Sequence, residues 1–275
     1  MSSIKTATTF NQEGLELYGQ RFLNSYAERV GKRIKLLCYA EKCSPINPDP
    51  KHIKILNVDK LLPKLIRFKE KWKDVPKANG VCPYSDVDEA EKCKTFKWNA
   101  VRFAHKSYAM LDACQRSKDW CVWMDADIFV HSYWGYDDFI KILPNNKWLT
   151  YVGRPKRAPG NLVYPETGFW GINMNHDISH RFLQEYERTY EEAEDRLFTL
   201  PQFHDCIVFQ RALDNCEDYK NQTVNYTEDS IKGGHPMVNG VLGAWIDHLK
   251  GDRKKAGKSR ACDITTERPE KYWKP

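Results

Sequence analysis

The chain has 275 residues, of which 41% are hydrophobic and 29% are charged, and its formal net charge at pH 7 is +6. This length excludes a small scaffold held together by disulfides or metals, and the composition is ordinary for a globular protein. Much of this net positive excess lies within residues 248–260, where it is compatible with a solvated segment, a nucleic-acid patch or a phosphate-binding site.

The cysteines and the apolar runs indicate the compartment. The nine cysteines are an odd number without the C-x-x-C spacing of zinc or redox sites, and several, such as Cys38 and Cys121, lie in apolar runs. The opening sequence MSSIKTATTFNQEG has no apolar core of a signal peptide, and no stretch approaches the roughly 18 apolar residues of a membrane span. We therefore expect a cytoplasmic protein without a membrane span.

Helical and strand patterns alternate in the first half of the chain. The first helix is indicated by Leu15, Tyr18, Phe22 and Tyr26, which share one face at helical spacing. Short apolar runs bounded by turn residues predict buried strands. The predicted elements are a helix at 15–30, strands at 33–40 and 53–58, a helix at 61–72, a loop at 75–95, a helix at 96–115 and a strand at 120–124.

The second half continues this pattern and then loses its periodicity. Its predicted elements are a strand at 149–153, a basic loop at 154–161, a strand at 169–174 and helices at 179–198 and 201–213. Beyond about residue 213 the chain is rich in turn formers. The alternation predicts an α/β fold with a mainly parallel central sheet flanked by helices and a less regular C-terminal half. Because no linker divides the chain, we expect one domain.

Two aspartates directly follow the apolar strand WCVWM. Side chains at positions i and i+2 of an extended backbone point the same way, so Asp125 and Asp127 are expected to reach a common point. Ligands of open α/β sheets bind at the carboxyl ends of the strands. Two carboxylates that converge there repel each other unless a cation lies between them, and oxygen ligands suit Mg²⁺ or Mn²⁺. The apolar flanks argue against a solvated turn, which is the usual context of D-x-D.

A second motif lies in the basic segment. Residues 248–254 have the form H-x-x-G-x-x-K. His248 offers an imidazole to a metal, Gly251 permits close approach of a phosphate, and Lys254 supplies a neutralising cation. On its own this motif is also compatible with a basic surface turn.

Together, the two motifs resemble the retaining GT-A glycosyltransferases of the family 8 type, which include glycogenin and bacterial lipopolysaccharide galactosyltransferases. The resemblance implies a single GT-A-like (Rossmann-like) domain over residues 1–275, with a nucleotide-binding half at about 30–130 and an acceptor half at about 131–275. It departs from the family where Lys255 and Ala256 replace the usual Pro-Trp. The implied ligands of Mn²⁺ (or Mg²⁺) are Asp125, Asp127 and His248, and those of a UDP-sugar donor are Asp125, Ala126, Asp127, Gly251 and Lys254.

Further donor contacts follow from the same resemblance. The helix before the D-x-D carries basic residues that reach the donor in this family, and Arg102 and Lys106 lie one turn apart on the predicted polar face. Charge on a solvated helix face explains either residue equally well. Tyr39 and Ala40, just after the first predicted strand, occupy the position at which GT-A folds receive the nucleotide base.

Two acidic residues are the candidates for catalysis. Asp205 opens a predicted helix, where a helix cap is the simplest role, but a family aspartate at a comparable point lies beside the donor sugar. Glu166, with Thr167, precedes a predicted strand and is a candidate for binding the acceptor or the sugar. Trp170 is a candidate for stacking on a sugar face, and His235 fits a plain turn better than a site.

These features predict a metal-dependent glycosyltransferase that moves a sugar from a UDP-sugar to a sugar or glycoconjugate acceptor with retention of configuration; a short transferase without an anchor suits a bacterium or a virus. One alternative is an inverting GT-A enzyme with Asp205 or Glu166 as base. A nucleotidyltransferase is disfavoured because no glycine-rich loop follows the first predicted strand. A basic nucleic-acid-binding protein is disfavoured because it has no need for paired aspartates at a buried strand end.

Overall fold

The computed structural model describes residues 3–154, 164–227 and 234–274. Seven strands form one sheet in the order β3-β2-β1-β4-β7-β6-β8, and β5 and β9 form a separate ladder. The strands of the described part are β1 (Ile4–Asn11), β2 (Lys35–Glu41), β3 (Ile53–Asn57), β4 (Trp120–Met124), β5 (Ile128–Val130), β6 (Leu149–Val152), β7 (Glu166–Asn173), β8 (Thr223–Asn225) and β9 (Ile246–His248).

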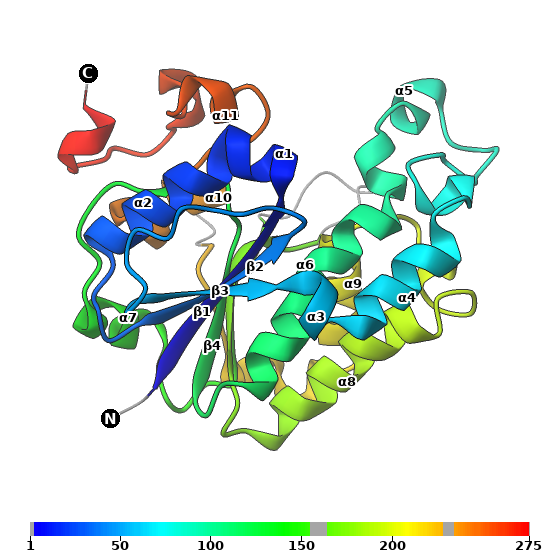
Figure 1. Ribbon diagram of the computed structural model, residues 1–275, viewed down its shortest axis with the longest axis horizontal. Coiled ribbons are helices and arrows are strands. Elements are labelled where there is room, and N and C mark those ends of the chain that lie inside the picture. Colours follow the sequence, from blue (N-terminus) through cyan, green and yellow to red (C-terminus); the bar gives the residue numbers. More distant parts are fainter. Residues whose placement is uncertain (1–2, 155–163, 228–233, 275) are drawn as a thin grey trace.

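Helices cover both faces of the large sheet (Figure 1). The longer ones are α2 (Gln20–Arg29), α4 (Pro63–Trp72), α6 (Ala100–Gln115), α7 (Tyr136–Ile142), α8 (Asp177–Glu191) and α9 (Asp205–Asp214). The short helices and helical turns are α1 (Gln12–Gly14), η1 (Leu15–Gly19), α3 (Val58–Leu61), η2 (Pro76–Ala78), α5 (Glu89–Lys92), η3 (Thr95–Trp98), η4 (Leu197–Thr199), η5 (Glu217–Gln222), α10 (Pro236–Asn239), η6 (Val241–Ala244), α11 (Arg253–Ala256), η7 (Ala261–Asp263) and η8 (Lys271–Trp273).

The core lies in two layers, one on each face of the sheet. Apolar side chains of α4, α6, α8 and α9 pack on one face, and those of α2 and α7 pack on the other. Figure 1 shows the first group of helices on the right of the sheet. The predicted fold class, a mainly parallel sheet flanked by helices, is confirmed. None of the helices in the described ranges is long and apolar enough to cross a membrane.

Strand direction gathers the functional side chains at one edge. Strand β1 pairs in parallel with both β2 and β4, so the carboxyl ends of all three strands lie at the same edge. Strand β7 runs antiparallel to β4, with Met124 opposite Phe169. Because of this reversal, the first residues of β7, Glu166 and Thr167, stand beside the end of β4. The edge therefore combines the ends of three strands with the beginning of a fourth.

The N-terminal region differs from its prediction. Residues 4–11 form β1, which lies between β2 and β4, although no strand is predicted there. The predicted helix at 15–30 begins earlier, at Gln12, because the side chain of Asn11 accepts a hydrogen bond from the amide of Gly14 over 2.9 Å and caps it. The helix continues through the π-helical turn η1 into α2. This capped start holds the helix directly at the end of β1.

Candidate functional site

Asp125 and Asp127 occupy a tight turn at the carboxyl end of β4. The amide of Ile128 donates to the carbonyl of Asp125 over 3.1 Å, which closes the turn between β4 and β5. Ala126, between them, is buried in the core and presents no side chain to a ligand. The two carboxylates thus approach a common point through a turn, and not through the extended backbone assumed from their spacing.

The ladder of β5 and β9 places His248 beside this turn. Ile128 lies opposite His248, and the amide of Leu249 donates to the carbonyl of Asp127 over 3.0 Å. Asp127 and His248, which are 121 positions apart in the sequence, become neighbours through this ladder. The backbone of one short strand therefore sets the position of the imidazole relative to the aspartates.

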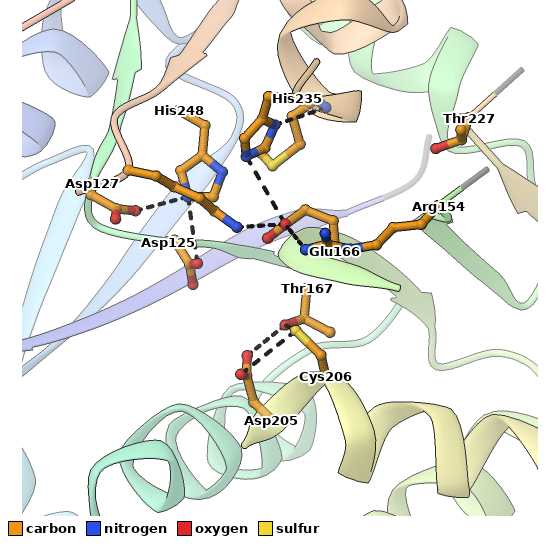
Figure 2. Close-up of polar contacts among 12 residues, drawn as sticks. Asp125, Asp127, Arg154, Glu166, Thr167, Asp205, Cys206, Thr227, His235 and His248 are labelled. Carbon is orange, nitrogen blue, oxygen red and sulfur yellow. Dashed lines mark hydrogen bonds and ion pairs between the residues drawn. The ribbon is translucent and has the colours of Figure 1, made fainter. Parts of the chain in front are cut away.

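The three side chains form a compact donor set (Figure 2). Nε2 of His248 lies 3.0 Å from Oδ1 of Asp127 and 3.8 Å from Oδ2 of Asp125. One ligand atom from each residue lies within 4.8 Å of the others. Burial alone raises the pKa of Asp127, but His248 and Lys254 outweigh it and hold this pKa well below its ordinary value. A set of two carboxylates and one imidazole fits Mn²⁺ or Mg²⁺.

Gly168 leaves room for the imidazole. A Cβ at this position of β7 would lie 2.6 Å from Cε1 and 3.1 Å from Nδ1 of His248. The histidine ring is 1% exposed and packs directly over the glycine. A side chain at residue 168 therefore requires the ring to move.

Gly168→Ala is expected to weaken Mn²⁺ binding by about tenfold or more, as loss of a group that orients a ligand does. The variant retains all three proposed ligand residues, so the expected loss comes from displacement of the His248 ring by the added Cβ. The measurement is the fraction of free Mn²⁺ by electron paramagnetic resonance, with circular dichroism to confirm the fold. Wild-type affinity in a folded variant contradicts the proposed role of His248.

Lys106 is a buried bridge between two carboxylates. Its Nζ lies 2.9 Å from Oδ1 of Asp125, 2.7 Å from Oδ2 of Asp205 and 2.5 Å from the carbonyl oxygen of Thr167. Burial lowers the pKa of Lys106, but the two carboxylates reverse this effect and raise it above its ordinary value. An ammonium group has three N–H donors, and these contacts use all of them. Lys106 therefore holds other site residues in place, with no donor left for a ligand.

Asp205 lies on the other side of this bridge. It is the first residue of α9, and His204 takes the N-cap position, so the alternative role of Asp205 as a helix cap is ruled out. Its Oδ2 accepts from Thr167 Oγ1 over 2.5 Å as well as from Lys106. Burial raises the pKa of Asp205, and Lys106 outweighs this effect and lowers it. Asp205 is thus an ionised carboxylate, which Lys106 links to the proposed metal ligand Asp125.

Glu166 is the centre of a second charged cluster. Its Oε2 lies 2.7 Å from Arg154, 2.5 Å from Lys250 Nζ and 3.9 Å from His235 Nε2. Burial opposes ionisation, but the surrounding cations hold the pKa of Glu166 well below its ordinary value. Figure 2 shows this cluster next to His248. The predicted basic loop at 154–161 lies, after Arg154, outside the described residues.

A cleft of about 390 Å³ opens next to the aspartates. Its lining combines the ends of β1 and β2 with the beginning of α6, and includes Lys254. Lys254 Nζ lies 3.0 Å from Oδ2 of Asp127. The lining residues are Thr9, Phe10, Asn11, Glu13, Gly14, Leu17, Tyr18, Glu41, Lys69, Asn99, Val101, Arg102, His105 and Lys254.

The predicted donor residues differ in their relation to this cleft. Arg102 lines it, whereas Tyr39 and Ala40 are buried in β2. The hydroxyl of Tyr39 donates to Asp112 over 2.5 Å, and Glu41, which follows Ala40, lines the cleft instead. Gly251 has a φ of +57° with open space around its Cα, so its backbone conformation is what favours glycine there.

The predictions for Trp170 and His235 are corrected. Trp170 is fully buried among aromatic side chains of α8 and α9, so it cannot stack on a sugar. His235 does more than form a turn, since its Nδ1 accepts from the amide of Met237 and its ring lies 4.9 Å from that of His248. Lys250 and Arg154 were not predicted. Lys250 could have been found from its place two residues after His248 in the basic segment.

Three glycosyltransferases of known structure resemble the chain. They are the bifunctional glycosyltransferase WbbM (12% identity, TM-score 0.46), mouse xyloside xylosyltransferase 1 (11%, 0.45), and the galactosyltransferase LgtC in complex with donor and acceptor sugar analogs (12%, 0.41). Each likeness covers 82% of this chain, and 38%, 85% and 73% of the other chain, respectively. No protein-family model and no curated protein matches the sequence. The activity therefore has to be inferred from the site.

Proposed function

We propose that the protein is a metal-dependent glycosyltransferase that moves a sugar from a UDP-sugar to a sugar or glycoconjugate acceptor with retention of configuration. The observation that carries the proposal is the convergence of Asp125, Asp127 and His248 beside a cleft lined by cations. A divalent cation held by these residues neutralises negative charge on a departing diphosphate. The side chains around the cation are assigned to binding the nucleoside diphosphate and to orienting the sugar.

The cleft suits a nucleoside diphosphate. Arg102 and Lys254 line it, Lys254 next to Asp127, and both supply positive charge for the phosphates. Glu41 supplies acceptor oxygens for hydroxyl or amide groups, and Lys69 and His105 hold this carboxylate in place. Burial opposes ionisation of Glu41, but His105 and Lys69 together lower its pKa to about 2. Its carboxylate therefore remains an acceptor at neutral pH.

The states of Glu166 and Asp205 favour retention over inversion. An inverting enzyme needs a carboxylate base near the acceptor, and these two residues were the candidates. Each is held by cations that lower its pKa, which makes it a weak base. Retaining transfer does not need such a base, because a departing phosphate oxygen can take the acceptor proton. We assign Asp205 and Glu166 to contacts with the sugar and to its orientation.

The basic segment is mostly occupied by internal ion pairs, which disfavours the nucleic-acid alternative. Lys250 pairs with Glu166, Arg253 with Asp263 and Lys254 with Asp127. A patch that binds nucleic acid instead presents its cations to the phosphates in solvent.

Calorimetry of UDP binding tests the proposal. UDP is expected to bind tightly in the presence of MnCl₂ and weakly without it, and Asp127→Ala and His248→Ala are each expected to abolish the difference. Asp137→Ala, which removes an exposed carboxylate from α7, serves as the matched control. If neither UDP nor GDP binds in the presence of Mn²⁺ or Mg²⁺, the metal assignment is wrong, and binding of nucleic acid at low salt becomes the next measurement.

A further inference from the structure

Lys254 stands between a proposed metal ligand and the cleft. Its Nζ lies 3.0 Å from Oδ2 of Asp127, while Oδ1 of the same carboxylate lies 3.0 Å from His248. Both oxygens of Asp127 are therefore paired. The ammonium of Lys254 also lies 4.8 Å from the ring centre of Tyr18, and both residues line the cleft. One flexible side chain thus reaches both the metal site and the proposed phosphate site.

The ion-pair network that includes Asp125 and Asp127 has as many cations as carboxylates without a ligand. Four carboxylates contact four cations through the ion pairs already described. A divalent cation alone adds two positive charges to this set, and a diphosphate alone adds negative ones. Only when the cation and the diphosphate bind together does the net charge of this network stay near its value without ligands. The carboxylates are Asp125, Asp127, Glu166 and Asp205, and the cations are Lys106, Arg154, Lys250 and Lys254.

We infer that Lys254 is an exchangeable counter-ion. When a divalent cation binds the carboxylate of Asp127, the ammonium of Lys254 leaves that carboxylate and pairs with the diphosphate. This inference rests on the proposed function, and it adds that the two ligands bind cooperatively. A divalent cation that binds alone displaces the ammonium of Lys254 from Asp127 and leaves the ammonium without a counter-ion. A diphosphate that binds alone draws Lys254 away and leaves Asp127 without its ammonium partner. Either ligand alone breaks the ion pair between Lys254 and Asp127 and leaves one of the two unpaired. When both ligands are bound, the cation pairs with Asp127 and the diphosphate pairs with Lys254.

The surroundings of Lys254 allow its side chain to move while its backbone stays fixed. The guanidinium of Arg21 donates to the carbonyl of Lys254 over 2.9 Å, and Arg253 pairs with Asp263. These contacts anchor α11. The Lys254 side chain is 19% exposed and has a four-carbon flexible stem. Lys106 differs, because it is 8% exposed and all three of its donors are used. Exchange is therefore assigned to Lys254 alone of these two lysines.

The test is a titration of Mn²⁺ with and without UDP, read by electron paramagnetic resonance, with UDP affinity at saturating Mn²⁺ from calorimetry. Lys254→Met is expected to bind Mn²⁺ alone about fivefold or more tightly than the wild type, a typical size for coupling between sites. The same variant is expected to bind UDP more weakly. Because linkage is reciprocal, the factor by which UDP tightens Mn²⁺ binding should fall with it. The control is Lys255→Met, which removes an exposed charge from the same helix.

The outcomes separate the inference from the proposed function. If Lys254→Met binds Mn²⁺ alone no more tightly than the wild type while both proteins bind UDP with Mn²⁺, the exchange is wrong and the proposed function stands. If Mn²⁺ binds more tightly but UDP affinity is unchanged, Lys254 acts only by repulsion and the exchange is again wrong. If the wild type binds neither ligand, the proposed function itself fails. Lys254→Gln replaces Lys254→Met in the same measurements if the methionine variant does not fold.

Discussion

Lys106→Met is expected to lower the free energy of unfolding by about 3–5 kcal/mol, the usual cost of removing one partner from a buried ion pair. The substitution nearly preserves the volume of the side chain, so little of the loss comes from packing. It leaves Asp205, which is 4% exposed, without its cation, and it removes the ammonium that Asp125 shares. Chemical denaturation monitored by tryptophan fluorescence measures the difference.

Two further variants show whether the loss comes from charge. Lys118→Met removes an exposed lysine just beyond α6 and is expected to change stability by no more than about 0.5 kcal/mol. Asp205→Asn in the Lys106→Met background is expected to restore part of the stability, because it removes the unpaired charge. A loss below about 1 kcal/mol in Lys106→Met contradicts the structural role assigned to this lysine.

The stability of the protein is expected to fall by about 3 kcal/mol as the pH decreases from about 6.5 to 4 through His204 alone. Burial lowers the pKa of His204 to about 4, and the ring is 3% exposed beside Gln202. Between these pH values the unfolded chain binds a proton at this residue and the folded chain does not. The contribution is therefore complete above pH 6.5, lost progressively below it, and constant again below pH 4.

The difference between wild type and His204→Gln isolates this effect from the titration of carboxylates. The free energy of unfolding of the variant is expected to depend less steeply on pH over this range, measured by denaturation at a series of pH values. His180→Gln is the control, because this histidine on α8 is exposed to water. Parallel curves for His204→Gln and the wild type show that the folded protein accepts the proton at this site.

Most strands of the large sheet and most of the longer helices are predicted from the sequence, but β1 and β8 are not. Strands β2 and β4 are predicted because they contain continuous apolar runs, and β3 because its apolar run is interrupted only by Lys54. Strand β1 contains Thr6 and Thr8, which are fully buried, and so lacks such a run. The hydroxyl of Thr6 is satisfied by Tyr26 at 2.7 Å, a partner that lies 20 residues away. The usable signal was the high content of β-branched residues between positions 4 and 9.

The proposed metal ligands are inferred from sequence motifs, whereas their mutual positions depend on tertiary pairing. The sequence gives no indication that Ile128 pairs with His248, because each strand of that ladder has three residues. The placement of Lys106 was equally inaccessible. Its pattern fits a polar helix face, but α6 is covered on this side by the beginning of β7 and α9, where Thr167 and Asp205 use its donors. Burial of a charge by distant partners leaves no local pattern.

The ladder of β5 and β9 also bears on the order of folding. Asp125 and Asp127 become neighbours by a local turn, which can form early because only a few residues must be ordered. His248 joins them only after closure of a loop of 121 residues, which carries a larger entropic cost and slows formation. If Asp125, Asp127 and His248 bind a divalent cation as proposed, high affinity is expected only of the completely folded chain, and during refolding it should arise after the helices and the local turn have formed.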